Sequence, residues 1–279
     1  MSAYAVRPVL LALCTVAFAS ALAQGVAQPA SPPDFASGGV AWTVGLAYAD
    51  LIAVPGSPSP ITPDPAHPYV DNSGFLQGKQ TTFRIGDISN PNLTQWAKDV
   101  MKKDNDEVLA GKIPFSPRAS CTAAGVPAYM LSGGGNTFFL QTPKEVVMIF
   151  DADAQVRRIY LNVRHSSNVK PSWYGESVGH YEGDTLVVDT IGMNTRTFID
   201  GYRTPHTENL HVIERWKKIG DGNGLEVVVT IDDPDTFKQP WQAIVRYRRV
   251  SETLAEQVCA ENNQVLFDYH IPVAAQSDF

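Results

Sequence analysis

From Thr137 onward, short runs of alternating apolar and polar residues recur between turn residues, at the spacing of about 8–12 residues that is typical of sandwiches and barrels. The odd positions from Leu225 to Ile231, for example, are all apolar and would share one face of a strand. The pattern predicts nine strands: Thr137–Gln141, Glu145–Phe150, Val156–Asn162, Ser177–Tyr181, Thr185–Ile191, Leu210–Ile219, Leu225–Asp232, Gln242–Val250 and Leu254–Cys259.

Several of these runs are joined by short polar turns. Residues 151–153 read Asp-Ala-Asp, 182–184 read Glu-Gly-Asp, 221–224 read Asp-Gly-Asn-Gly and 251–252 read Ser-Glu. Links this short leave no room for a crossover helix, so the strands that they join run antiparallel. A chain of hairpins of this number closes most simply into a barrel, which removes the exposed edges. The predicted fold is mainly β, an antiparallel barrel or strongly curled sheet of the lipocalin or calycin kind.

One helix is predicted before the strands, from Leu93 or Thr94 to about Leu109. Pro91 precedes this segment and Gly111 follows it, which are typical signals for the start and the end of a helix. Its apolar residues form an irregular stripe, and the charged run 102–107 is interpreted as its solvated face.

The segment before the helix has a different composition. Residues 24–75 are rich in Pro, Gly, Ser and Ala and show no periodicity. Scattered large apolar residues such as Trp42 allow this segment to lie along the main domain as an extended arm. The predicted organisation is a signal peptide at 1–23, a Pro/Gly-rich arm at 24–92, a helix and linker at 93–115 and a β-barrel domain at 116–279.

The N-terminus has the layout of a cleavable signal peptide. Arg7 precedes an apolar run from Val9 to Leu22, and the triplet Ala-Leu-Ala at 21–23 precedes Gln24. A membrane span needs about 20 continuous apolar residues, and Thr15 interrupts a shorter run here. We therefore expect a periplasmic or secreted protein without a membrane span.

The net charge of the chain limits the kinds of partner that it is expected to bind. The formal net charge is −7, and it becomes −8 when the signal segment is removed, because that segment carries Arg7 and no acidic residue. Such an acidic chain argues against nucleic acid or an anionic membrane as the main partner. The chain also has no phosphate loop, no dinucleotide fingerprint and no Gly-x-Ser-x-Gly elbow. We expect a small-molecule partner and no cofactor, and the oligomeric state stays open.

Beyond the signal peptide the chain keeps two cysteines, Cys121 and Cys259. An even pair in an oxidising compartment predicts one disulfide. It would close a loop of about 140 residues, which the chain-entropy model values at about 5 kcal/mol as an upper figure. The alternative is two unpaired thiols, because free cysteine is often buried.

Two motifs resemble a known family. Residues 171–190 read PSWYGESVGHYEGDTLVVDT, and 204–208 read TPHTE. The sequence from about Trp96 to Asn263 thereby resembles a large, mostly uncharacterised family of secreted bacterial proteins. The resemblance implies a link to the breakdown of aromatic compounds, which would suit a cofactor-free lyase or decarboxylase.

Groups that can transfer protons are densest between Arg164 and Arg215, where four of the six histidines lie. His206 follows Pro205 in a loop, so its backbone is held while its ring reaches toward a pocket mouth, and His211 begins the next strand. A histidine oriented by a carboxylate serves as a general base near neutral pH. The predicted catalytic residues are His206, His211, Asp189, Glu208 and Glu214.

Arg164, His165 and Tyr174 are the predicted substrate-binding residues. Arg164 would meet an acid, and Tyr174 would act as an acid or a stacking surface. In the alternative interpretation such polar groups only satisfy one another. A zinc site made by His165, His206 and His211 with one carboxylate is a rival hypothesis. Because no His-x-His or His-x-x-x-His spacing supports it, no metal is predicted.

Two classes of function follow from these residues. One is a secreted, cofactor-independent enzyme that acts by proton transfer on a small hydrophobic, aromatic molecule, as a lyase, decarboxylase or dehydratase does. The other is a periplasmic protein that binds a small molecule without catalysis. The enzyme is favoured, because the apolar strands repeatedly end in His, Asp or Glu beside turns.

Overall fold

The computed structural model describes residues 31–256, apart from 37–38, 46–47, 71–78, 80–82, 118–119, 134, 152–154 and 255. The expected signal peptide and Cys259 lie outside the described residues. Export and the Cys121–Cys259 disulfide therefore stay predictions.

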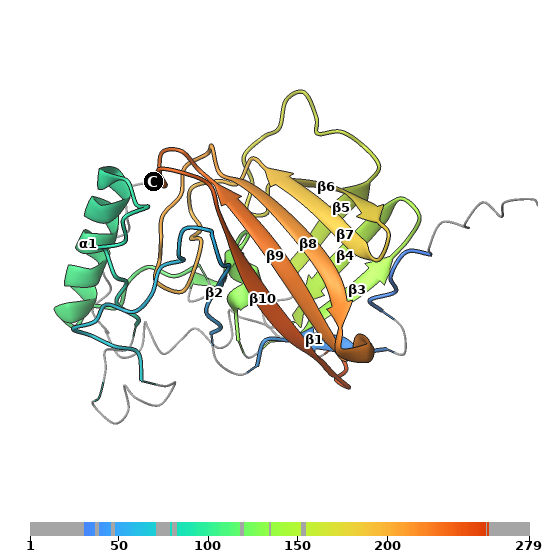
Figure 1. The fold of residues 1–279 in the computed structure, drawn as a ribbon, viewed down its shortest axis with the longest axis horizontal. Coiled ribbons are helices and arrows are strands. Elements are labelled where there is room, and N and C mark those ends of the chain that lie inside the picture. The colour runs from blue at the N-terminus through green and yellow to red at the C-terminus, as the bar shows by residue number, and fades with distance from the viewer. Residues whose placement is uncertain are drawn as a thin grey trace, which may run out of the picture. The chain divides into compact units, whose positions relative to one another are not determined.

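Nine of the described strands form a closed ring, in which each strand pairs with its neighbours and β1 joins β3 to β10 (Figure 1). A tenth, β2 (Ile52–Ala53), pairs with the start of β10. The expected mainly β fold with a barrel and one helix is confirmed. The ring consists of β1 (Ala41–Thr43), β3 (Thr137–Gln141), β4 (Glu145–Phe150), β5 (Gln155–Leu161), β6 (Glu176–Glu182), β7 (Thr185–Ile191), β8 (His211–Ile219), β9 (Gly224–Asp232) and β10 (Trp241–Val250).

Large side chains pack the barrel interior. The odd positions of β9, from Leu225 to Ile231, are all buried, as the alternation in the sequence predicts. Trp216 of β8 contacts Phe139 and Tyr247, with 5.6 Å between ring centroids in both pairs. The aromatic rings therefore occupy this part of the interior with the close packing of an ordinary core.

The strand that closes the ring is not the one that the sequence predicts. Leu254, the start of the expected ninth strand, is exposed and lies outside any strand, and Cys259 lies beyond the described residues. The arm supplies β1 instead, where Trp42 pairs with Arg249 of β10 and with Thr137 of β3. Burial of the whole of β1 explains why these three residues stabilise the closure.

One pair of neighbouring strands departs from the antiparallel pattern. β5 and β6 run parallel, from the pair Ile159–Ser177 to the pair Leu161–Gly179. The chain returns between them through the loop 162–175, which rises above the strands in Figure 1. Because the pairing begins only at Ile159, the first residues of β5 extend past the start of β6, and the barrel wall opens there.

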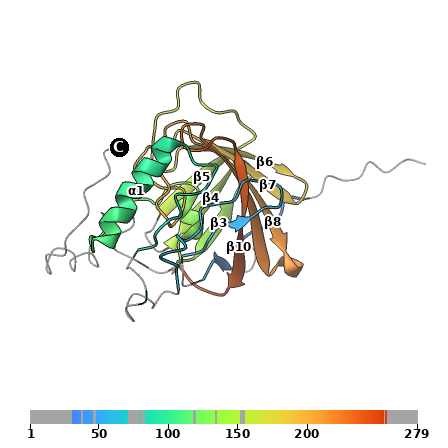
Figure 2. The same ribbon diagram turned by 60° about the vertical axis from the view of Figure 1, so that its left-hand side comes forward.

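The expected helix is confirmed as α1 (Gln95–Leu109), which lies outside the ring of strands (Figure 2). Thr94 caps its N-terminus by accepting a hydrogen bond from the N–H of Ala97. Asp104, expected on the solvated face, is buried beside Arg203. Of the helices that the structure describes, none has the length and the apolar character that crossing a bilayer requires.

Candidate functional site

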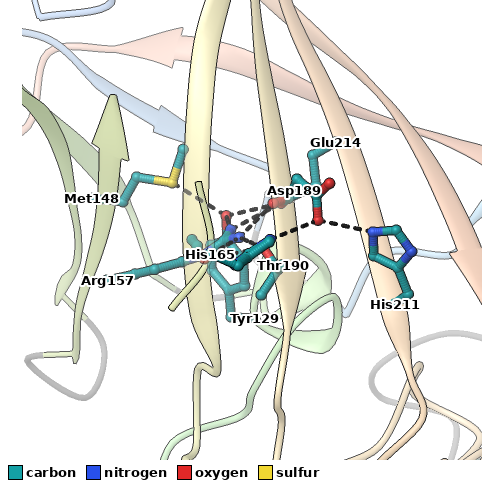
Figure 3. A network of polar contacts seen from close by, with 9 residues as sticks. Tyr129, Met148, Arg157, His165, Asp189, Thr190, His211 and Glu214 are labelled. Carbon is teal, nitrogen blue, oxygen red and sulfur yellow. Dashed lines mark hydrogen bonds and ion pairs between the residues drawn. The ribbon is translucent and has the colours of Figure 1, made fainter. Parts of the chain in front are cut away.

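Two polar networks lie back to back on β7. Asp189 points out of the barrel toward His165 and His211, and the next residue, Thr190, points inward toward Arg157 (Figure 3). Successive residues of a strand face opposite sides of a sheet, so one strand supports both networks.

The inner network is centred on the buried guanidinium of Arg157. Its Nη1 and Nη2 donate to the two carboxylate oxygens of Glu214, at 2.9 and 2.5 Å. The hydroxyls of Tyr129, Ser177 and Thr190 accept its other hydrogen bonds, at 2.7 to 3.1 Å. All three nitrogens are thereby engaged, as a buried charge requires. Glu214, predicted as a catalytic residue, is the buried counter-ion of this arginine.

The outer network is a row of alternating carboxylates and imidazoles. Nδ1 of His165 lies 3.1 Å from Oε1 of Glu176, and its Nε2 lies 3.0 Å from Oδ1 of Asp189. The same Asp189 oxygen lies 2.8 Å from Nε2 of His211. Ser166 donates its N–H and its hydroxyl to Glu176. The row therefore fixes the start of the loop 162–175 to β6, β7 and β8.

Electrostatic interactions within the outer network favour the charged forms of its histidine and carboxylate side chains. The hydrogen bond to Asp189 raises the pKa of His211, despite the opposing effect of burial. The same bond is the largest cause that lowers the pKa of Asp189, and the hydroxyl of Ser166 does the same for Glu176. The nearby charge of Asp232 adds to the shift of His211. An imidazolium and ionised carboxylates thus stabilise one another.

Replacing Asp189 with asparagine should lower the pKa of His211 toward the ordinary value of about 6.5, because the largest cause of the upward shift is removed. A raised pKa in the folded state adds stability that is complete below the unfolded-state pKa and is lost as the pH rises through the folded-state pKa. The wild type should therefore lose more stability than Asp189→Asn as the pH rises above about 6.5. Imidazole NMR titration and thermal melts measure both effects, with His67 as the unaffected reference.

A pocket of about 380 Å³ opens where β5 and β6 separate. It joins the two networks, because Arg157 and Ser177 of the inner network and Glu176 of the outer one all line it. Two tyrosine rings and two cations also contribute. The full lining is Val156, Arg157, Arg158, Tyr160, Asn168, Val169, Lys170, Tyr174, Gly175, Glu176 and Ser177.

Two glycines allow the loop to seat beside the pocket. Gly175 has a φ of +63°, and a Cβ there would lie 2.3 Å from the carbonyl oxygen of Ile191. A Cβ on Gly192 would lie 2.4 Å from Cγ1 of Val169. The backbone of Gly192 also accepts a hydrogen bond from the N–H of Ser172 at 3.0 Å. The loop 162–175 is therefore packed closely on the chain that follows β7.

Among the substrate-binding residues that the sequence predicts, Tyr174 lines the pocket. Its ring packs edge to face on the buried Tyr129, with 6.0 Å between centroids. His165 lies one contact away, bonded to Glu176. Arg164 is exposed and is not part of the pocket lining. The structure thus brings two of the three residues to one place.

The predicted catalytic residues separate into different places. Asp189 and His211 share the outer network, whereas Glu214 lies inside the barrel. Glu208 is exposed. His206 is buried, where Nδ1 donates to the carbonyl of Thr207 at 3.0 Å and Nε2 accepts from Thr197 at 2.7 Å. Burial lowers the pKa of His206, so its neutral ring joins loops instead of reaching a pocket mouth.

Sequence reasoning missed Arg157 and Glu176. Arg157, like the buried Ile159 and Leu161, lies on the side of β5 that faces the barrel interior. A charged residue at an inward position is unusual, and the sequence alone could have shown it. Glu176 stands inside the motif at 171–190 but carries no local mark of its partner, because His165 reaches it only through the returning loop.

Across the part of the chain that the structure describes, no group of three or more His, Cys, Asp or Glu residues is arranged to hold a metal ion. The two imidazoles of the outer network converge instead on one oxygen of Asp189. The residues predicted for a zinc site also separate, because His206 lies in its own buried environment.

Comparison with known proteins assigns this chain to no family. No family model and no curated protein matches the sequence. A solved structure of a mutant of the fluorescent protein UnaG aligns with 48% of this chain and 86% of its own, at 17% identity and a TM-score of 0.26. A TM-score this low supports no conclusion about this chain. The class therefore follows from the strand pairing itself, which defines a closed and mainly antiparallel β-barrel protein.

Proposed function

We propose that this protein binds a small aromatic molecule with an acidic group, in the pocket between β5 and β6. The observation that carries the proposal is the lining of that pocket, where the rings of Tyr160 and Tyr174 lie with the cations Arg158 and Lys170. Its volume of about 380 Å³ falls in the range of small-molecule sites. A barrel that binds a small molecule at an opening in its wall suits this fold.

The three cationic side chains that line the pocket differ in whether their N–H donors are free to bind a ligand. Arg157 is fully engaged by Glu214 and three hydroxyls, so it stabilises the pocket floor and has no donor to spare. Arg158 is exposed and pairs with Glu145 at 2.7 Å. Lys170 is exposed and has no ion pair among the residues that the structure describes. We assign the acidic group of the ligand to Lys170, with Arg158 as a second contact.

The test is calorimetric titration with benzoate, benzamide and cyclohexanecarboxylate as probes. Benzoate should bind best, because benzamide lacks the charge and cyclohexanecarboxylate lacks the aromatic ring. Lys170→Gln should weaken benzoate binding by up to about fivefold, the range for an exposed ion pair. Tyr174→Ala should weaken it by up to about tenfold through lost ring contacts.

Lys103→Gln, an exposed change on α1, is the matched control and should leave benzoate binding unchanged. The proposal is wrong if Lys170→Gln and Tyr174→Ala bind benzoate as the wild type does. It also fails if none of the three probes binds.

A second candidate is catalysis by proton transfer on the same ligand. The specific observation is that Glu176 lines the pocket and also accepts a hydrogen bond from His165. A carboxylate held by a histidine at the wall of a pocket is suited to accept a proton and to return it. The row continues to Asp189 and His211, so the protonated His165 would be stabilised by a second carboxylate.

A further inference from the structure

The outer face of β3, β4 and β5 is unusually apolar. Leu140, Val156 and Tyr160 on this face are 55%, 53% and 41% exposed. Strand pairing places Leu140 beside Val147, and Ile149 beside Val156, so these side chains form adjacent rows. Contiguous exposed apolar rows of this kind usually mark an interaction surface.

Several cations lie on or beside this face. Arg158 lies on it, and Lys144 occupies the turn between β3 and β4. Arg164, which follows the exposed Val163, and Lys170 are exposed in the adjoining loop. Lys144, Arg164 and Lys170 have no ion pair within the described ranges.

Most of the acidic groups near this face already have partners; the exposed Asp34, beside the end of β3, has no ion pair among the described residues. Glu145 accepts from Arg158 at 2.7 Å. At the end of β6, Glu182 pairs with Arg215 at 2.7 Å, and Asp184 of the following turn pairs with Lys217 at 3.0 Å. The local balance is therefore positive, although the chain carries a net charge of −7.

We propose that this face docks on an anionic lipid surface. Exposed leucine and valine, a tyrosine and a rim of lysine and arginine are the combination that places a surface among lipid headgroups. Each cation close to an anionic membrane contributes about 1 kcal/mol. The proposal does not depend on what the pocket binds.

The size of the face favours a lipid surface over a second copy of the chain. Three strands about 4.8 Å apart and a few residues long span on the order of a few hundred Å². A stable dimer needs about 800 Å² from each partner. A membrane needs no such area, because headgroup attraction adds to shallow insertion of a few side chains.

The net charge does not exclude this docking. The net charge is a sum over the whole chain, so it argues against binding to an anionic membrane only on average and not for each part of the surface. At physiological ionic strength charges are screened beyond about 8 Å, so the groups next to the headgroups decide the interaction. The acidic residues on the far side of the barrel then have little effect.

Docking would also place the pocket at the lipid surface, because Val156, Arg158 and Tyr160 belong both to this face and to the pocket lining. A ligand that partitions into the headgroup region would then reach the pocket without crossing bulk water.

The experiment is co-sedimentation of the full chain with vesicles of phosphatidylglycerol and phosphatidylcholine in a 1:3 ratio, and with vesicles of phosphatidylcholine alone. Wild-type protein should bind the first and not the second. The double variant Lys144→Gln/Arg164→Gln should bind about 25-fold more weakly, about fivefold for each charge. The double variant Lys102→Gln/Lys103→Gln on α1 is the matched control and should bind as the wild type does.

A second pair of variants tests the apolar rows. Leu140→Ser should weaken binding to the anionic vesicles, whereas Ile52→Ser, an exposed change on β2, should not. Equal binding to both kinds of vesicle, or no binding at all, would overturn the proposal. If light scattering instead shows a dimer that Leu140→Ser dissociates, the face is an interface between copies of the chain and the proposal is wrong.

Discussion

Replacing Arg157 with methionine should lower the free energy of unfolding by about 3–5 kcal/mol, the cost of breaking a buried ion pair by removing one partner. The change leaves the carboxylate of Glu214 fully buried without its counter-ion. It also removes the donor shared by three hydroxyls, those of Tyr129, Ser177 and Thr190. Urea unfolding followed by tryptophan fluorescence measures the loss.

Two further variants separate this effect from lost packing. Arg157→Met/Glu214→Leu removes both charges and should recover most of the stability, because an apolar pair of similar volume avoids the desolvation cost. Arg246→Met breaks the exposed pair with Glu226, whose atoms are 2.9 Å apart, and should cost less than about 1 kcal/mol. If Arg157→Met costs no more than Arg246→Met, the inner network does not stabilise the barrel.

Much of the barrel could be predicted from local pattern. β3, β4 and β7 have the bounds that the alternation and the turns predict. β1 could not be found in this way, because three residues in a Pro- and Gly-rich arm carry too little periodicity. Its place in the ring depends on contacts with β10 and β3, which follow it by more than 90 residues.

The sequence indicated which residues could belong to the candidate site better than it indicated which of them come together. His165, Asp189 and His211 were each visible as polar residues beside apolar strands, and the structure joins them. Glu214 lies on the same face of β8 as Val212 and Trp216, so its inward direction could be inferred from parity, but its partner on β5 could not. The pocket could not be predicted from the sequence either, because it results from the parallel pairing of β5 with β6 and from the loop that returns between them.

Replacing Glu176 with glutamine should lower the rate of any proton transfer in the pocket by about a hundredfold to ten-thousandfold, the usual contribution of a general base. The hydroxyl of Ser166 lowers the pKa of Glu176, which keeps its carboxylate ionised at neutral pH but makes it a weaker base than an ordinary glutamate. Glutamine keeps the shape of the side chain but removes this basicity. Deuterium uptake from D₂O into the methylene group of phenylpyruvate, followed by NMR, measures the transfer without requiring a known product.

Glu182→Gln is the matched control, because Glu182 is an exposed carboxylate of the same strand that also pairs with a histidine, His180, at 3.0 Å. It should leave the exchange rate unchanged, and benzoate titration of both variants shows whether the pocket is intact. A wild-type rate that Glu176→Gln retains would exclude Glu176 as the base. If the wild type binds benzoate and exchanges no proton, the row from Glu176 to His211 holds the loop 162–175 in place, and binding without catalysis is the function that the pocket supports.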